Sequence, residues 1–297
     1  MSLCDRVTVL RDGRTIGTRN IADITAQDLV TMMIGRAEKI DSLGLLDISD
    51  EKVLEVKHLS RAGMFEDMNL ELHKGEILGL YGLVGSGRTE LARLICGADP
   101  YDGGEIYIGG KKAVIRSMAD AVYKYKLGYV TENRKEEGLV LPFSVGENLT
   151  MTILKKLTNK FGKISLKQGR DETESMIEKM AVKTPSQQTP VESLSGGNQQ
   201  KVSIGKWLLA GCDILIIDEP TVGVDVGAKR HIHEIIWNLA KEEGKSIILI
   251  SSDMTEMITL ARRILVFKDF HISSEITGLN DREHTYEEVS GLIGNAM

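Results

Sequence analysis

Two adjacent carboxylates follow a run of aliphatic residues in the segment ILIIDEP, from Ile214 to Pro220. Such a run is typical of a buried parallel strand, and α/β sheets bind their ligands at the carboxyl ends of these strands. Asp218 and Glu219 are therefore expected at a ligand site. A salt bridge at the end of the strand is the alternative role for this pair.

A glycine loop upstream carries groups that bind phosphate. The phosphate-loop pattern GxxxxGKT is met by Gly82, Gly87 and Thr89, but Arg88 stands where the pattern has lysine. An aliphatic strand precedes the loop and a helix follows it. The loop amides would wrap the phosphates, and the Thr89 hydroxyl would hold Mg²⁺.

The segment LSGGNQQK, from Leu194 to Lys201, offers a second anion site. Ser195 is a natural helix N-cap, and Gly196 and Gly197 leave the first backbone amides uncovered. A helix N-terminus with free amides binds phosphate groups. Taken alone, the segment is also compatible with a simple helix start.

The composition is typical of a soluble globular protein. The 297 residues are 42% hydrophobic and 27% charged, which is ample for a sizeable core. The net charge of −6 argues against a general nucleic-acid binder. No apolar run approaches the about 18 residues of a membrane span, and no signal peptide is evident. The three scattered cysteines, Cys4, Cys96 and Cys212, are typical of reduced thiols.

Alternating strand and helix patterns predict an α/β fold class, with a hairpin between Arg6 and Arg19 near the start. The other predicted strands cover Val53–Leu59, Met68–Leu72, Ile77–Tyr81, Gly103–Ile108, Leu127–Thr131, Ile214–Ile217, Ser246–Ser251 and Ile264–Lys268. The predicted helices cover Thr25–Ile34, Thr89–Ile95, Ser117–Tyr125, Ser144–Leu154, Leu166–Met180, Lys201–Ala210, Val226–Trp237 and Thr255–Leu260.

An internal repeat links the two ends of the chain. The segment DRVTVLRDG is similar to RRILVFKDF, with Arg6 matching Arg263, and MMIG at Met32–Gly35 is similar to GLIG at Gly291–Gly294. The two matches lie one domain length apart. We therefore expect the tail of one unit followed by a second unit with its own tail. Two unrelated hairpins are the alternative.

Together these motifs resemble the ABC ATPase family. The glycine loop corresponds to the Walker A motif, LSGGNQQK to the ABC signature and ILIIDEP to the Walker B motif, and the resemblance runs from about Val53 to Lys268. The segments GLVGSGRTEL, YVTENRKEEGLVLPFSVGENL, DEPTVGVDVGAK and ISSDMTEM make the chain similar to one class in particular. This class is the second nucleotide-binding domain of monosaccharide importers of the ribose, galactose and xylose type.

The resemblance implies a P-loop NTPase core of the RecA-like α/β type, with an antiparallel β lobe and an inserted helical subdomain. Residues 1–40 would be the tail of a preceding nucleotide-binding domain, and residues 41–52 a linker. Residues 53–277 would form the nucleotide-binding domain, with its helical subdomain at about 133–205. Residues 278–297 would be a C-terminal tail with a short helix.

The resemblance also implies roles for individual residues. ATP would be bound by Gly82, Gly85, Ser86, Gly87, Arg88, Thr89 and Glu90. Mg²⁺ would be held by Thr89, Asp218 and Glu132, and Glu219 would be the catalytic general base. The signature residues Leu194, Ser195, Gly196, Gly197, Asn198 and Gln199 would contact the nucleotide of a sister domain. Asp225 would lie in the D-loop that crosses the dimer interface, and it also suits the N-cap of the next helix.

Three positions depart from the family pattern. Arg88 replaces a lysine, Glu132 a glutamine, and Ser252 the switch histidine that senses the γ-phosphate. A guanidinium is broad and planar where an ammonium is compact. Losing a transition-state hydrogen bond of the histidine kind costs ~10²–10³ in rate. We therefore expect this site to bind nucleotide but turn over slowly, while the signature serves the preceding domain. A solvated loop residue is the alternative for Glu132.

Two further surfaces have only short markers. Adenine would stack on Phe65 or on Arg61, and Phe65 also suits the core. Phe143, Val145 and the GENL segment would face a coupling helix of a membrane subunit, unless their apolar side chains pack inward.

The implied function is the ATPase part of an ABC importer that couples ATP binding and hydrolysis, with Mg²⁺, to uptake of a sugar or sugar-like solute. Its partners would be a sister nucleotide-binding domain, membrane permease subunits and, indirectly, a periplasmic or lipoprotein sugar-binding protein. Nucleic acid is not an expected partner. The protein would lie at the cytoplasmic face of the membrane. The alternative is a non-hydrolytic nucleotide-binding regulatory module of a soluble tandem ABC protein.

Overall fold

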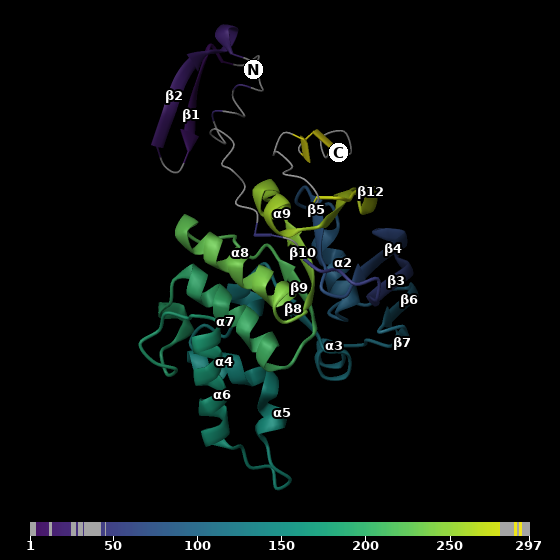
Figure 1. Ribbon diagram of the computed structural model, residues 1–297, viewed down its shortest axis with the longest axis vertical. Helices are drawn as coiled ribbons and strands as arrows, with labels where there is room; N and C mark the ends of the chain where they lie inside the picture. The colour runs from purple at the N-terminus through teal and green to yellow at the C-terminus, as the bar shows by residue number, and fades with distance from the viewer. Residues whose placement is uncertain are drawn as a thin grey trace.

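The computed structural model describes residues 4–11, 14–24 and 46–279, together with residues 28, 32, 43–44, 288–289 and 291–292. Most of the helix predicted at Thr25–Ile34 and nearly all of the tail predicted at 278–297 lie outside these residues. The described chain forms a six-stranded sheet, a four-stranded antiparallel sheet, a group of helices and a two-stranded hairpin near the N-terminus (Figure 1).

Where the predicted strands and helices fall on described residues, they are confirmed apart from one helix, with shifts of up to five residues at their ends. The strands are β1 (Arg6–Arg11), β2 (Arg14–Asn20), β3 (Lys52–Arg61), β4 (Phe65–His73), β5 (Ile77–Gly82), β6 (Gly103–Ile108), β7 (Lys111–Ala113), β8 (Leu127–Val130), β9 (Ile214–Asp218), β10 (Ser246–Ser251), β11 (Arg263–Lys268) and β12 (His271–Ile276). The helices are α2 (Arg88–Ile95), α3 (Met118–Tyr125), α4 (Val145–Thr150), α5 (Leu154–Leu157), α6 (Leu166–Lys179), α7 (Gly196–Leu209), α8 (Val226–Lys241) and α9 (Met254–Leu260).

The central sheet orders its strands β12-β11-β5-β10-β9-β8. All neighbours from β11 to β8 are parallel, whereas the edge strand β12 is antiparallel to β11. Parallel strands end at the same edge of a sheet. The loop after β5 and the carboxylates that end β9 therefore lie at one edge, separated by β10 alone.

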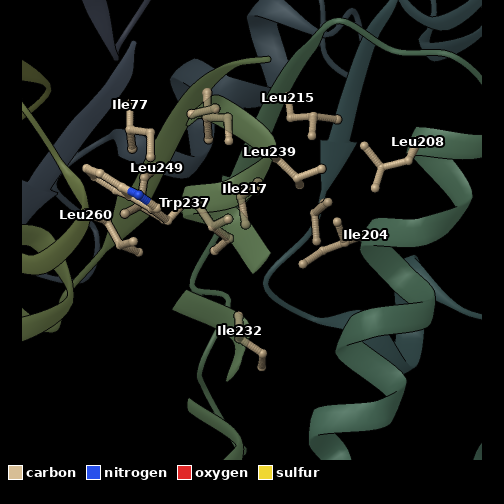
Figure 2. Close-up of a cluster of buried hydrophobic side chains, with 14 of the residues drawn as sticks. Ile77, Ile204, Leu208, Leu215, Ile217, Ile232, Trp237, Leu239, Leu249 and Leu260 are labelled. Carbon is tan, nitrogen blue, oxygen red and sulfur yellow. The ribbon is translucent and has the colours of Figure 1, made fainter. Parts of the chain in front are cut away.

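Alternate residues of the inner strands face two different cores. In β9, Leu215 and Ile217 belong to the cluster beneath the helices, whereas Ile216 belongs to the cluster facing the antiparallel sheet. Figure 2 shows the first cluster, in which the strand residues meet Ile204 of α7 and Trp237 of α8. Because both faces of these strands are buried, their sequences are continuous aliphatic runs rather than alternating ones.

The antiparallel sheet, in the order β4-β3-β6-β7, covers the opposite face of the central sheet. Its buried residues, among them Leu54 and Phe65, pack in one cluster with Leu94 of α2. The helices α4, α5 and α6 lie together at the end of the molecule opposite the β1–β2 hairpin (Figure 1). This arrangement confirms the predicted fold class, in which a nucleotide-binding core carries a β lobe and a helical part.

The single helix predicted at Ser144–Leu154 is wrong. The segment consists of α4, a 3₁₀ turn over Met151–Ile153 and the short helix α5. The turn contains Thr152, whose buried hydroxyl donates a hydrogen bond of 2.7 Å to the carbonyl of Lys206 on α7. A tertiary bond of this kind competes with regular helix geometry, and no local pattern reveals it.

The surface prediction for Val145 is also wrong. Val145 is fully buried in the core beneath the helices, together with Leu149, because both project toward α7 and α6 from one face of α4. Phe143, by contrast, is 48% exposed. Of the apolar residues expected to face a membrane subunit in this segment, only Phe143 is on the surface.

The two hairpins β1–β2 and β11–β12 have the same internal register. In the first, Val9 pairs with Gly17 and the register shifts between residues 9 and 10. In the second, Val266 pairs with Ser274 and the register shifts between residues 266 and 267. Each position of the second hairpin thus lies 257 residues after its counterpart in the first.

Candidate functional site

The loop between β5 and α2 depends on two glycines. Gly85 and Gly87 have φ values of +83° and +108°, a region that residues with side chains rarely adopt. A Cβ atom at position 87 would lie 2.8 Å from a ring carbon of Phe270, so the close packing also requires glycine. The Ser86 amide donates to the Leu83 carbonyl at 3.0 Å, so the first amides of α2, from Arg88 onward, are the groups left to bind phosphate.

Asp218 ends β9 with its side chain fully buried. Its Oδ2 accepts hydrogen bonds from the Thr89 hydroxyl at 2.8 Å and from the Tyr129 hydroxyl at 3.1 Å. Its Oδ1 has no hydrogen-bond partner among the described residues. Burial raises the pKa of Asp218 to about 7, and the nearby charges of Glu132 and Glu219 act in the same direction.

These oxygens fit a magnesium ion. Mg²⁺ prefers oxygen ligands and is usually bound through one or two carboxylates, waters and substrate phosphates. The orphaned Oδ1 of Asp218 and the Thr89 hydroxyl supply such oxygens beside the phosphate loop. The exposed Glu132 contributes further negative charge near Asp218. A divalent cation here would also relieve the cost of burying an ionised carboxylate.

Glu219 follows directly and has a left-handed backbone, with φ at +45°. Its Oε2 accepts a hydrogen bond from the Ser252 hydroxyl at 3.2 Å, and its Oε1 lies 3.4 Å from Nη1 of Arg88. Burial raises the pKa of Glu219, while the Ser252 bond and the Arg88 charge act against this rise. The carboxylate is thus held by two of the three residues, Arg88 and Ser252, that depart from the expected motif pattern.

The Arg88 guanidinium occupies the space between the phosphate loop and Glu219. Its side chain is 6% exposed, and its Nη2 lies 3.4 Å from the carbonyl oxygen of Leu83. The ion pair with Glu219 is therefore nearly closed off from water. A buried pair of this kind fixes both groups, because removing either one leaves the other charge uncompensated. Glu90, in the first turn of α2, is half-buried.

The signature turn starts α7 with Ser195 as its N-cap residue. The Ser195 hydroxyl caps no backbone amide; instead it accepts a hydrogen bond from the Asn198 side chain at 2.9 Å. Gln199 is buried, and its amide donates to the carbonyls of Val191 and Leu194. The first amides of α7, at Gly196 and beyond, are therefore left for an external anion.

The known proteins that this chain resembles agree with the motifs in its sequence. The profile of a family described as ABC transporter matches residues 65–222. The chain is also 44% identical over 287 residues to the ribose import ATP-binding protein RbsA of Clostridium tetani, which covers 97% of this chain and 56% of the relative. The chain belongs to the ABC transporter family.

A second ABC relative, the ribose import ATP-binding protein RbsA of Bacillus subtilis, is 42% identical over 297 residues, or 98% of this chain and 58% of the relative. The chain thus spans little more than half the length of these curated relatives.

Solved structures confirm the ABC ATPase fold. One is a dimeric ATP-binding cassette in a post-hydrolysis state bound to ADP and Pi, with a TM-score of 0.65, 22% identity, and coverage of 75% of this chain and 98% of that chain. Another is a nucleotide-free ATP-binding cassette from an ABC transporter, with a TM-score of 0.67, 19% identity, and coverage of 82% and 95%.

The structure decides the role of Phe65 and one of the two roles expected of Asp225. Phe65 is 2% exposed and meets Phe270 edge to face, with ring centroids 5.5 Å apart, so it is a core residue. Arg61 lies 3.5 Å from Asp99, at the rim of the β lobe. Asp225 caps α8 by accepting a hydrogen bond of 2.9 Å from the Ala228 amide, which confirms its N-cap role. Its D-loop role stays a prediction.

The cassette also uses residues that sequence reasoning missed. Tyr129 donates to Asp218, Phe270 packs on the phosphate loop, and Arg134 donates to the backbone between Glu219 and Asp225. No local pattern indicates the contacts of Arg134, because its partners lie 88 and 89 residues away. None of the described helices is long and apolar enough to cross a membrane.

Proposed function

We propose that this ABC cassette binds and hydrolyses ATP as part of an importer for a sugar or sugar-like solute. Relatives at 42–44% identity that are named ribose import ATP-binding proteins support the transport role. The hydrogen bond of 2.8 Å between Thr89 and Asp218 carries the ATPase role, because it joins the phosphate loop to the two carboxylates.

ATP would lie with its phosphates on the amides between Gly85 and Thr89. Mg²⁺, bound by the Thr89 hydroxyl and Asp218, would neutralise charge on the phosphates. Glu219 would accept a proton from water and direct its oxygen toward the γ-phosphorus. A carboxylate with a raised pKa accepts a proton more readily near neutral pH, which suits this role.

We propose that this site turns over slowly. The Glu219 carboxylate is bound by Arg88 and Ser252, so hydrolysis would require this buried ion pair to rearrange. Ser252 is also too short to replace a histidine at the γ-phosphate. The signature from Leu194 to Gln199 would instead complete the ATP site of a sister domain.

The matching hairpins support a tandem arrangement. The shared register and bulge of β1–β2 and β11–β12 are independent of the sequence match at Arg6 and Arg263. In this cassette β11 pairs with β5 of the same core. We propose that residues 1–40 belong to a preceding cassette, in which β1 would pair with the corresponding phosphate-loop strand.

The remaining partners would be permease subunits and, through them, an external sugar-binding protein, with the cassette at the cytoplasmic face of the membrane. A groove of about 320 Å³ lies in the helical part, lined by apolar side chains such as Leu154, Leu157 and Leu166. Leu166 is 70% exposed, and Phe143, which precedes the groove residue Ser144, is 48% exposed. These residues are our candidates for the surface that meets a permease.

The test is steady-state ATPase activity and ATP affinity of this chain, with Glu219→Gln as the control. We expect ATP binding in both proteins, because Glu219 is not needed to cradle the phosphates. Turnover of the unaltered chain should be low yet depend on Glu219. Loss of ATP binding in Gly87→Ala would support the assignment of the phosphate loop as the ATP site. If the unaltered chain does not bind ATP in a Mg²⁺-dependent way, the proposal is refuted.

The slow-site proposal has its own test. Arg88→Lys and Ser252→His are introduced together into a longer protein whose preceding cassette has a disabled phosphate loop. Turnover should rise, because the compact ammonium frees Glu219 and the imidazole restores a hydrogen bond. Unchanged turnover with unchanged ATP affinity would contradict this assignment and leave the ATP-binding role intact.

A further inference from the structure

Arg134 is a buried cation outside the described ATP site. It begins the π-helical turn Arg134–Gly138, two residues after Glu132, and is 6% exposed. Its Nη1 donates to the carbonyl of Val222 at 2.7 Å, and its Nη2 donates to the carbonyl of Gly223 at 3.2 Å. These two carbonyls belong to the segment that connects Glu219 with α8.

The partners of Arg134 within the described residues are backbone carbonyls and no carboxylate. Its Nε has no hydrogen-bond partner there, and burial lowers the pKa of the guanidinium. Burying a charge without a counterion is costly. A leucine or methionine would fill this space at lower cost, so general packing does not account for an arginine. A forked guanidinium, in contrast, can donate a hydrogen bond to each of the two carbonyls at once.

The held carbonyls lie three and four residues after the proposed general base. The chain leaves Glu219 in a left-handed conformation and turns twice, with the Val222 amide donating to the Glu219 carbonyl at 3.2 Å and the Val224 amide to the Thr221 carbonyl at 3.2 Å. Arg134 binds the outer side of these turns. A shift of the Val222 and Gly223 carbonyls would therefore move the backbone that orients Glu219.

One of these carbonyls, that of Gly223, lies against the signature turn. A Cβ atom placed on Gly196 would lie 2.5 Å from the Gly223 oxygen and 2.9 Å from Nη2 of Arg134. Gly196 therefore packs directly against the bonded pair. The other end of the π-helical turn is also fixed, because the buried Lys206 of α7 donates to the Gly138 carbonyl. Arg134 is thus anchored to the helix that begins at the signature.

We propose that Arg134 is a positioning residue that fixes the segment from Glu219 to Asp225 against the signature turn. The inference deepens the proposed ATPase function and rests on it for its catalytic consequence. Through Arg134, the backbone carrying the general base of one ATP site is tied to the turn that would serve the other site. The guanidinium touches no reacting group; it acts through the carbonyls it binds.

Hydrogen exchange of the nucleotide-free chain tests the positioning directly. Arg134→Gln and Arg134→Lys should raise exchange of the Val222 and Val224 amides by about tenfold or more, since two charge-assisted bonds are lost or halved. The exposed neighbour Lys135→Gln is the matched control and should leave both amides unchanged. Arg134→Lys keeps the positive charge, so we expect at least this variant to fold. The melting temperature of each variant is measured to check that it is folded.

Kinetics supply the second readout. If Arg134 orients Glu219, Arg134→Lys should lower kcat by about tenfold while KM for ATP stays within about twofold, because the phosphate loop is untouched. A purely structural defect would lower the fraction of active protein without changing exchange selectively at these amides. Unchanged exchange at Val222 and Val224 in folded Arg134→Lys and Arg134→Gln would overturn the inference. Lack of Glu219-dependent turnover in the unaltered chain would instead refute the proposed function, and exchange would still decide the positioning.

Discussion

Lys206 offers a quantitative test of how the helix that starts at the signature is anchored. The residue lies on α7 and is 4% exposed. Its ammonium donates to the carbonyl of Gly138 and lies 4.7 Å from the centre of the Trp207 ring. No carboxylate of the described residues pairs with it. We predict that this buried charge makes the stability of the protein depend on pH between neutrality and pH 10.

The size of the effect follows from the pKa of the lysine. Burial lowers the pKa of Lys206 from 10.5 to about 8. Between these values the folded protein binds fewer protons than the unfolded chain, so the free energy of unfolding rises as the pH increases. One pKa unit corresponds to about 1.4 kcal/mol, so the ionised form costs about 3 kcal/mol at pH 7. Most of this cost, about 2.5 kcal/mol, is relieved by pH 10.

The Trp207 ring reduces this figure. An ammonium near an aromatic face is favoured by about 0.5–2 kcal/mol, and this term raises the pKa of the lysine. The change in stability between pH 7 and pH 10 should therefore lie between about 0.5 and about 2 kcal/mol. The hydrogen bond to Gly138 is present with either form of the amine, so it contributes at both pH values.

The assay is urea unfolding of the wild type and of Lys206→Met at pH 7 and pH 10. Methionine has a similar length and no charge, and the titration of all other groups cancels in the difference between the two proteins. We expect the wild type to gain about 0.5–2 kcal/mol relative to the variant on raising the pH. Lys167→Met, at an exposed position of α6, controls for the loss of a surface ammonium. An equal difference at both pH values would refute the assignment of a buried, destabilised ammonium.

Two further predictions concern the signature and the metal. Gly196→Ala should lower the free energy of unfolding by about 1–3 kcal/mol in urea titrations, because the added Cβ would lie 2.5 Å from the Gly223 oxygen. Gly227→Ala is the control: the atom nearest to its added Cβ would be 3.4 Å away, so the free energy of unfolding should change by less than about 1 kcal/mol. Thr89→Val should weaken Mg²⁺-dependent ATP binding by about 10–100-fold in calorimetry, whereas Thr89→Ser retains the hydroxyl and should bind normally. Equal affinities would exclude Thr89 from the metal site.

The elements around the site were predictable because their patterns are local. The inner strands are buried on both faces, so runs such as ILIID and SIILIS identify them directly. Helix caps are similarly local, and Asp225 caps α8 as its sequence suggests. The meeting of Thr89 with Asp218 was predictable too, since parallel strands deliver both residues to one edge of the sheet.

The features that escaped prediction depend on contacts between distant backbone groups. Arg134 binds carbonyls 88 and 89 residues away, and a carbonyl leaves no trace in the sequence. Thr152 breaks a predicted helix through a bond to a residue 54 positions away. Val145 is buried although the sequence predicts it on the surface. The apolar residues around it do not indicate which face of α4 is buried, because packing against other helices decides that.

The contact between Phe270 and the phosphate loop has a thermodynamic consequence. The Phe270 amide donates to the Ser86 carbonyl at 2.9 Å, so the turn between β11 and β12 leans on the loop that would wrap the phosphates. If nucleotide orders this loop, it must also oppose detachment of the turn. Binding free energies are reciprocal. A partner that binds β12 or the chain beyond it would therefore change the affinity for ATP by the same factor by which ATP changes the affinity for that partner.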